Sequence, residues 1–209
     1  MKAVILCDGQ IPPSGLIEPA VQEADLFIAA DGGANTARDL GLEPDLITGD
    51  LDSYVYHPEE SNKIIRDSDQ ETNDLEKALS LAEQRGARRV VVYGATGKRL
   101  DHTLKNLSVL KKYLPRFDDL RYMDQYGEIL LLPKTFRRRV PPGTVLSLFP
   151  LSGAVSGITT RGLRYPLHGE TLENGVRDGS SNEAVSEQIE ITHEKGDLLL
   201  FIVTHPDNH

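Results

Sequence analysis

The stretch Leu26-Phe27-Ile28-Ala29-Ala30-Asp31-Gly32-Gly33-Ala34-Asn35 joins an apolar run to an acidic residue and a pair of glycines. Five consecutive apolar residues are typical of a strand that is buried on both faces, as in a parallel sheet. The glycine pair allows a tight turn into the helical stretch that follows. A buried strand that leads through a turn into a helix predicts an α/β domain.

The same pattern extends to both sides of this stretch. Together with Leu26–Ala30, the apolar runs predicted to form short strands are Ala3–Cys7, Leu46–Thr48, Lys63–Ile65 and Arg89–Tyr93. Segments with helical spacing lie between several of these runs. Strands that alternate with helices predict a parallel sheet covered by helices on both faces.

The clearest helix is predicted from four apolar residues that fall on one helical face. They are Leu75, Ala78, Leu79 and Ala82. Asn73 and Glu76 are three residues apart, which predicts a capping box at the start of this helix. Gly86 is suited to its C-terminal end. A second helix is expected at Asp101–Leu114.

After about Pro133 the chain shows no helical period, and turn signals such as Pro141-Pro142-Gly143 separate short apolar stretches. The predicted strands of this part are Val145–Pro150, Ala184–Thr192 and Asp197–Thr204. Closely spaced strands of this kind predict a β-sandwich or a small barrel. We therefore expect an α/β domain at 1–133 and a smaller all-β domain, a β-sandwich, at 134–209, with the boundary near 125–137.

Composition restricts the classes of function. The 209 residues include 23 basic and 32 acidic side chains, for a net charge of −9, which argues against nucleic-acid binding. No apolar run approaches the roughly 20 residues of a membrane-spanning helix, so no membrane partner is expected. The single cysteine, Cys7, cannot form an internal disulfide and fits a reducing compartment, so a cytoplasmic location is predicted.

Acidic residues follow one predicted strand after another. They are Asp31, then Asp50 and Asp52 in Gly49-Asp50-Leu51-Asp52-Ser53, then Asp74 at a helix start and Asp101 after the fifth strand. Because parallel strands end at one edge of a sheet, these carboxylates are expected to lie near one another. Two carboxylates 4 Å apart repel by about 4 kcal/mol at an effective dielectric near 20. Mg²⁺ relieves such repulsion by joining carboxylates to phosphate oxygens. Aspartate is also the usual turn and cap residue, so spacing alone leaves a purely structural role open.

Glycine-containing turns add a second indication of phosphate binding. The backbone N–H groups at Gly32 and Gly33 lie before a helical stretch, where an anion can bind. The loop Gly94-Ala95-Thr96-Gly97-Lys98-Arg99 is not a P-loop, because only two residues separate its glycines and Arg99 follows the lysine. A glycine loop with two cations is nevertheless suited to hold phosphate oxygens, although a solvated loop is the alternative.

Five motifs, in the same order along the chain, resemble those of the thiamine pyrophosphokinase family. They are Asp31–Ala34, Gly49–Ser53, Gln70 with Asp74, Gly94–His102, and Gly179–Glu183. The resemblance implies an α/β domain followed by a β-sandwich, and a homodimer with its sites at the subunit interface. It also implies an Mg²⁺-dependent attack of the thiamine hydroxyl on the β-phosphorus of ATP, the co-substrate, with release of AMP.

The resemblance further implies roles for individual residues. The metal ligands that the resemblance implies are Asp31, Asp50, Asp52 and Asp74. The catalytic residues that it implies are Asp50, Asp52, Asp74 and Asp101. Asp101 is expected to orient or deprotonate the thiamine hydroxyl. The ligand-binding residues that the resemblance implies are Asp31, Gly32, Gly33, Gln70, Gly97, Lys98, Arg99, His102, Ser180, Ser181 and Asn182. Lys98, Arg99 and His102 are expected to face the nucleotide phosphates. Ser180, Ser181 and Asn182 are expected to contact thiamine.

The sequence departs from the family pattern at two points. Asn73 stands where the family often has threonine, and the chain contains no tryptophan, although some relatives use one against the thiamine ring. Either Tyr165 takes that place or the aromatic contact is absent. Three alternatives therefore stay open. They are a pyrophosphokinase of the same fold that acts on a hydroxymethylpterin, a non-catalytic sensor of nucleotide or thiamine, and a metal-dependent phosphohydrolase.

Overall fold

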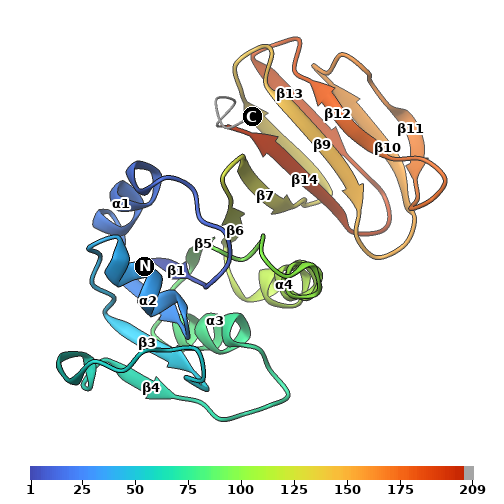
Figure 1. The fold of residues 1–209 in the computed structure, drawn as a ribbon. Helices are drawn as coiled ribbons and strands as arrows, with labels where there is room; N and C mark the ends of the chain where they lie inside the picture. The colour runs from blue at the N-terminus through green and yellow to red at the C-terminus, as the bar shows by residue number, and fades with distance from the viewer. Residues whose placement is uncertain (205–209) are drawn as a thin grey trace. The chain divides into compact units, whose positions relative to one another are not determined.

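The structure is a computed structural model that describes residues 1–204. The chain divides into two compact units, Met1–Gln125 and a second unit that begins at Tyr126 (Figure 1). The sequence placed the end of the first domain at residue 133. The strand β7 (Gly127–Leu131) pairs with β14 (Leu198–Val203), so residues 127–131 belong to the second unit. Residues 205–209 of the expected second domain lie outside the described residues.

The first unit alternates strands and helices as expected. Its strands are β1 (Lys2–Leu6), β2 (Leu26–Ala30), β3 (Leu46–Gly49), β4 (Ile64–Arg66), β5 (Arg89–Tyr93) and β6 (Asp119–Met123). Its α-helices are α1 (Ser14–Gln22), α2 (Gly33–Asp39), α3 (Asp74–Gln84) and α4 (Leu100–Tyr113), with short 3₁₀ turns at Pro58–Glu60 and Leu114–Arg116. The helix α1 and the strand β6 were not predicted.

The six strands of this unit form a parallel sheet in the order β6-β5-β1-β2-β3-β4. Val4 in β1 lies opposite Phe27 in β2 and Val91 in β5, and every pairing between these strands is parallel. The strands β1 and β2 are almost entirely apolar because both faces of the sheet are covered. The predicted fold class is confirmed.

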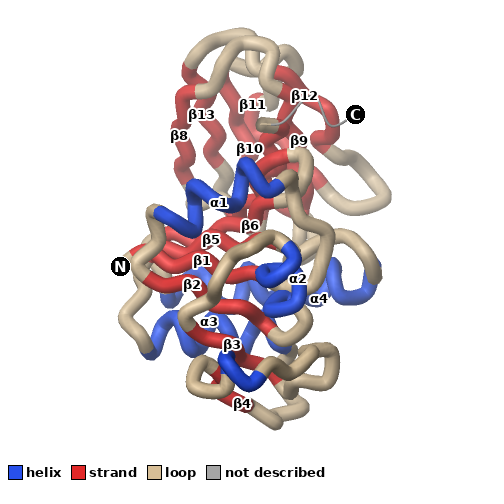
Figure 2. Tube along the Cα trace, turned by 60° about the vertical axis from the view of Figure 1, so that its left-hand side comes forward, coloured by secondary structure: helices blue, strands red, loops and turns tan. Residues whose placement is uncertain are grey.

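Helices cover the two faces of this sheet (Figures 1 and 2). On one face, Ile17 of α1 and Ala37 of α2 pack in a cluster with Val4, Leu6 and Phe27. The helix α3 packs against β2 and β3 and buries the apolar face that the sequence predicted. The predicted capping box is also present at the N-terminus of α3. All strands of this sheet end at the same edge, and the loops that follow them therefore lie together.

The second unit consists of two antiparallel sheets. One has the order β12-β9-β14-β7 and the other has the order β11-β10-β13-β8. The remaining strands are β8 (Thr135–Arg139), β9 (Val145–Pro150), β10 (Val155–Arg161), β11 (His168–Leu172), β12 (Gly179–Glu183) and β13 (Gln188–Thr192). The predicted strand at Ala184–Thr192 is therefore too long, because residues 184–187 connect β12 to β13.

One apolar core lies between the two sheets of this unit. Leu146 and Leu200 from the first sheet join Ile158 and Ile191 from the second in a single buried cluster. The neighbours of Leu146 along β9 and of Ile191 along β13 are more exposed, which is the alternation expected of a sandwich. Within residues 1–204, no helix is both long and apolar enough to cross a bilayer.

Candidate active site

A cavity of about 530 Å³ lies at the carboxyl edge of the parallel sheet, within the first unit. The loops after β1, β2, β3 and β5 line it, together with the first turns of α3 and α4. The charged side chains of its wall are Asp8, Asp31, Asp50, Asp52, Asp74, Lys77, Lys98 and Arg99. Five carboxylates thus share one cavity with three cations, which is an arrangement suited to a metal–phosphate ligand.

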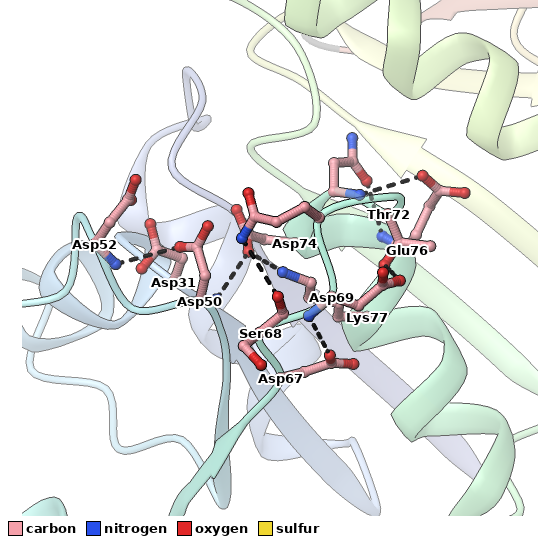
Figure 3. A network of polar contacts seen from close by, with 12 residues as sticks. Asp31, Asp50, Asp52, Asp67, Ser68, Asp69, Thr72, Asp74, Glu76 and Lys77 are labelled. Atoms are coloured by element: carbon pink, nitrogen blue, oxygen red, sulfur yellow. Dashed lines mark hydrogen bonds and ion pairs between the residues drawn. The ribbon is translucent and has the colours of Figure 1, made fainter.

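Three of these carboxylates converge on one point. Asp31, Asp50 and Asp74 each offer an oxygen atom, and these atoms all lie within 4.8 Å of one another (Figure 3). Carboxylate oxygens are hard donors of the kind that Mg²⁺ prefers. Three such donors in one place fit a divalent cation, because without one their charges repel each other.

Asp31 stands at the end of β2 and is 6% exposed. Burial raises the pKa of its carboxyl group, and the negative charges of Asp74 and Asp52 raise it further. Its Oδ1 atom accepts a hydrogen bond of 3.4 Å from the backbone N–H of Ser53. The backbone of Asp31 has φ 45°, a left-handed conformation that is uncommon outside glycine and is often found at functional sites.

Asp74 is the first residue of α3, where the positive end of the helix dipole favours an anion. Burial raises the pKa of this carboxyl group, an effect that Lys77 opposes and Asp50 reinforces. Its Oδ1 atom lies 3.4 Å from the backbone N of Asp50, so it also holds the loop after β3. The carboxylate therefore joins two of the loops that form the site.

Asp50 and Asp52 do not project together from an extended segment. Leu51 between them has φ 67°, and the backbone N–H of Asp52 turns back to donate a 3.2 Å hydrogen bond to Asp50 Oδ1. Asp52 lines the cavity, but it lies outside the group of three converging carboxylates. Its own Oδ1 atom accepts a hydrogen bond of 2.9 Å from the hydroxyl of Ser53.

The glycine loop after β5 supplies two of the three cations of the cavity, Lys98 and Arg99. Gly97 has φ 80° and Lys98 has φ 52°, so the loop turns sharply and directs Lys98 back toward β1. There the Lys98 ammonium lies 2.9 Å from Asp8 Oδ1. Arg99 and His102 also line the cavity. The three residues that were predicted to face phosphates are thus present in its wall.

Other predicted residues lie outside the lining of this cavity. Asp101 is exposed on the first turn of α4, and its two oxygens pair with Arg99 at 3.1 and 2.5 Å. The hydrogen bond from Arg99 lowers the pKa of this carboxyl group, which makes it a weaker base. Gln70 is exposed and donates to the carbonyl oxygen of Ser68 at 3.4 Å.

Gly32 and Gly33 have a packing role that the sequence did not reveal. A Cβ atom on Gly33 would lie 2.1 Å from the carbonyl oxygen of Leu6, so only glycine allows α2 to approach β1 this closely. A Cβ atom on Gly32 would lie 3.0 Å from Cγ of the Asp8 side chain, which is a less severe contact. Neither glycine belongs to the lining of the cavity, although both stand beside it in sequence.

The predicted thiamine contacts belong to the second unit. The side chain of Asn182 is buried, where it accepts from the backbone N of Tyr165 at 3.1 Å and donates to its carbonyl oxygen at 2.8 Å. Ser180 and Ser181 are exposed, and Ser181 has φ 55°. Asn182 therefore holds the backbone of Tyr165, a residue that is 64% exposed.

Several polar residues of the cavity wall were not predicted from the sequence, among them Asp8, Lys77 and Asn106. Asp8 follows the first strand, so the rule that found the other acids would also have found it. Lys77 and Asn106 carry no comparable signal, because a polar residue within a helix normally faces solvent. Both are buried here, at 5% and 8% exposure, and both line the cavity.

Comparisons with known proteins agree with this arrangement. The family model described as "Thiamin pyrophosphokinase, catalytic domain" matches residues 17–122, and "Thiamin pyrophosphokinase, vitamin B1 binding domain" matches residues 134–198. Thiamine pyrophosphokinase 2 of Arabidopsis thaliana is 32% identical over 215 residues, which cover 85% of this chain and 78% of that protein. The Bacillus subtilis (strain 168) protein named thiamine pyrophosphokinase is 26% identical over 193 residues, covering 85% of this chain and 87% of that protein.

Solved structures show the same fold. The crystal structure of thiamine pyrophosphokinase from Bacillus subtilis has a TM-score of 0.82 at 24% identity, and it covers 98% of this chain and 99% of that one. At that identity the likeness shows the fold alone. The two family models together span most of the chain, and the cavity lies within the part that the catalytic-domain model matches. The chain therefore belongs to the thiamin pyrophosphokinase family.

Proposed function

We propose that this chain is a magnesium-dependent thiamine pyrophosphokinase, which transfers the pyrophosphoryl group of ATP to the hydroxyl of thiamine and releases AMP. The observation that carries the proposal is the convergence of Asp31, Asp50 and Asp74 within 4.8 Å, inside a cavity that also presents Lys98 and Arg99. Carboxylates alone would repel a polyphosphate. Cationic side chains alone could bind a polyphosphate, but that role would not explain the carboxylates beside them. The combination suits a nucleotide that arrives with a divalent cation.

Asp31, Asp50 and Asp74 are the residues that would hold Mg²⁺, and Asp52 adds negative charge beside them. Mg²⁺ in this place would withdraw charge from the phosphate oxygens during transfer. The raised pKa of Asp31 and of Asp74, which burial causes, fits this role because a cation restores the ionised form of each carboxyl group. The main role of these residues is thus to allow an anionic cavity to bind a polyphosphate through the cation.

Lys98, Arg99 and His102 act on the phosphate chain. Their positions on one loop and one helix turn allow them to hold the oxygens that gain charge during transfer. A bond forms between the thiamine oxygen and the β-phosphorus, the bond from that phosphorus to the bridging oxygen of AMP breaks, and the proton of the thiamine hydroxyl is released to water. Asp101 holds Arg99 through both oxygens, so we assign it the orientation of Arg99 in preference to removal of the hydroxyl proton.

The acceptor site is assigned to the second unit, in accordance with its resemblance to a vitamin B1 binding domain. Ser180 and Ser181 are exposed and available for hydrogen bonds to thiamine, and Tyr165 offers an aromatic surface where no tryptophan is present. The homodimer with sites at the subunit interface and the cytoplasmic location stay predictions.

Incubation of the purified protein with thiamine, ATP and Mg²⁺ tests the proposal, with thiamine diphosphate and AMP as the expected products in equal amounts. EDTA in a parallel reaction is expected to abolish both. Release of ADP or pyrophosphate in place of AMP would contradict the transfer that we propose. The absence of any product with thiamine, at saturating nucleotide and metal, would contradict the function itself.

The same assay separates the alternatives. AMP that forms only with a hydroxymethylpterin would identify the rival acceptor, because the phosphate site is unchanged and the acceptor pocket differs. Phosphate that is released from ATP without any acceptor would identify a phosphohydrolase. Binding of thiamine or nucleotide by calorimetry, without turnover, would identify a sensor.

A further inference from the structure

A buried lysine faces the carboxylates of the cavity. Lys77 lies in the first turn of α3, its side chain is 3% exposed, and its ammonium stands 3.6 Å from Asp74 Oδ1 (Figure 3). Lysine is rarely buried to this extent unless its charge is paired. The residue also belongs to the wall of the cavity, so its charge acts on whatever binds there.

The position is unfavourable for a cation by two criteria. The N-terminus of a helix carries a partial positive charge, which repels an ammonium group. Removal of the ammonium group from water is costly unless anions compensate for it. The separation of 3.6 Å from Asp74 is longer than a hydrogen bond, so one tight ion pair does not supply that compensation. A second carboxylate, that of the exposed Asp69, also lies in the field of Lys77, which lowers the pKa of that carboxyl group.

The neighbouring acid in the helix does not neutralise Lys77. The carboxylate of Glu76 is fully buried and is bound by Lys105 at 3.0 Å and Lys112 at 2.7 Å. Glu76 also accepts the backbone N–H of Asn73 in the capping box. Its charge is therefore balanced by other residues, whereas the positive charge of Lys77 acts on Asp74 in the cavity and on the exposed Asp69 outside its lining, and acts to lower the pKa of both carboxyl groups.

We propose that Lys77 is a built-in counter-cation, which shares the carboxylate of Asp74 with the divalent ion and limits how tightly that ion binds. The inference rests on the metal site of the proposed function. Lys77 offsets part of the repulsion among Asp31, Asp50 and Asp74 and keeps the empty cavity assembled. Its positive charge also opposes the arriving divalent ion, so the ion binds more weakly and is released more readily with the product.

The sign of the effect distinguishes this role from a purely structural one. In Lys77→Met the chain keeps a long side chain but loses the charge, so the carboxylates attract a divalent ion more strongly. We expect Mg²⁺ to bind on the order of tenfold more tightly, in calorimetry of the nucleotide-free protein at pH 8. The Mg²⁺ concentration for half-maximal turnover is expected to fall by a similar factor, together with kcat. General damage to the site would weaken Mg²⁺ binding instead.

Two control variants make the test specific. Lys77→Arg keeps the charge and is expected to bind Mg²⁺ within about twofold of the wild type. Lys63→Met removes a lysine that directly precedes β4, at the end of the strand opposite the carboxyl edge, where it pairs with Glu43 at 3.5 Å. This variant is expected to change nothing. If Lys77→Met does not fold, Lys77→Gln is measured in the same way.

The outcomes separate failure of the inference from failure of the proposed function. Unchanged or weaker Mg²⁺ binding in the uncharged variants would overturn the role of Lys77, as would equal tightening in Lys77→Arg. A wild-type protein that binds no Mg²⁺ would overturn both the metal site and the inference. Because Mg²⁺ binding is measured without thiamine or ATP, a wrong acceptor would leave this test unaffected.

Discussion

The ammonium of Lys98 lies 2.9 Å from Oδ1 of Asp8, a residue 90 positions earlier in the chain. Both side chains are more than half exposed, so this ion pair contributes only about 0–1 kcal/mol to folding. The ion pair therefore acts mainly on the two loops that it joins, the loop after β1 and the glycine loop. The loop after β1 also receives support from the glycine loop, because the backbone N–H groups of Gly9 and Gln10 donate to the carbonyl oxygens of Gly94 and Thr96.

Replacement of Asp8 by asparagine is expected to lower the KM for ATP by about two- to fivefold, because the carboxylate competes with phosphate for Lys98. The melting temperature is expected to change by only a few degrees, in line with the exposure of the pair. Steady-state kinetics with varied ATP, together with a thermal melt, provide the measurement.

A double-mutant comparison checks that the effect passes through Lys98. Lys98→Met alone is expected to raise the KM for ATP about tenfold or more, because a phosphate contact is lost. Addition of Asp8→Asn to that variant is then expected to change little. An equal effect of Asp8→Asn in both backgrounds would show that Asp8 acts on ATP without Lys98.

Asparagine at Asp50 or Asp74 is expected to reduce turnover by about 100-fold or more, because a charged metal ligand is replaced by a neutral group. Asp74→Asn keeps an acceptor at the start of α3, and Asp50→Asn stands in a loop, so both proteins are expected to fold. Turnover is measured at saturating Mg²⁺, with circular dichroism as the control for folding. Near-normal turnover in both variants would contradict the metal site.

The stability of the metal-free protein is expected to depend on pH through Asp31. Burial raises the pKa of this carboxyl group above its ordinary value of 3.8, so its contribution to stability is greatest below that value and is lost as the pH rises through the raised pKa. Asparagine removes the charge and also tolerates the φ of 45° at this position. Asp31→Asn is therefore expected to be more stable than the wild type by about 1 kcal/mol at pH 7 in EDTA, with a smaller difference at pH 4.

Urea unfolding of the two proteins at both pH values measures this difference. Mg²⁺ provides an internal control, because a ligand that binds the native state stabilises it, and the wild type is expected to gain more from Mg²⁺ than the variant does. A difference in stability that is the same at pH 4 and pH 7 would indicate that the charge of Asp31 is not responsible.

The first unit was predictable because its strands and its helices have clearly different sequence patterns. Apolar runs such as Leu26–Ala30 identify buried strands, and the spacing of Leu75 and Leu79 identifies a helix. The parallel arrangement then places the acids at one edge without further information. The helix α1 was missed because Pro19 lies inside it and its N-terminus has no side-chain cap.

The second unit was harder to predict in detail because several of its strands are polar. The strand β12 contains Gly179, Ser180 and Ser181, which carry no signal of a strand, and its pairing with β9 contains a register shift. The cavity likewise contains a residue whose place could not be predicted from the sequence. Lys77 lies within a helix at a position where sequence reasoning expects solvent, and only the packing of the helix reveals that it faces the carboxylates.

Asn73 departs from the threonine that the family often has, and the structure gives it two separate contacts. Its Oδ1 atom accepts the backbone N–H of Glu76 at 3.0 Å, which caps α3, and its Nδ2 atom donates to Asn106 Oδ1 at 2.9 Å. Asn106 in turn donates to the carbonyl oxygen of Ala95 at 2.7 Å, within the glycine loop. The cap and the loop therefore depend on different atoms of one side chain.

Two substitutions at this residue separate the contacts. Asn73→Thr keeps the cap and loses the donor to Asn106, so we expect a loss of stability below about 1 kcal/mol, with a raised KM for ATP as the glycine loop loosens. Asn73→Ala loses both contacts and is expected to lower the unfolding free energy by about 1–2 kcal/mol. Urea unfolding and steady-state kinetics measure the two effects separately. An Asn73→Thr protein as unstable as Asn73→Ala would show that the bond to Asn106, and not the cap, stabilises α3.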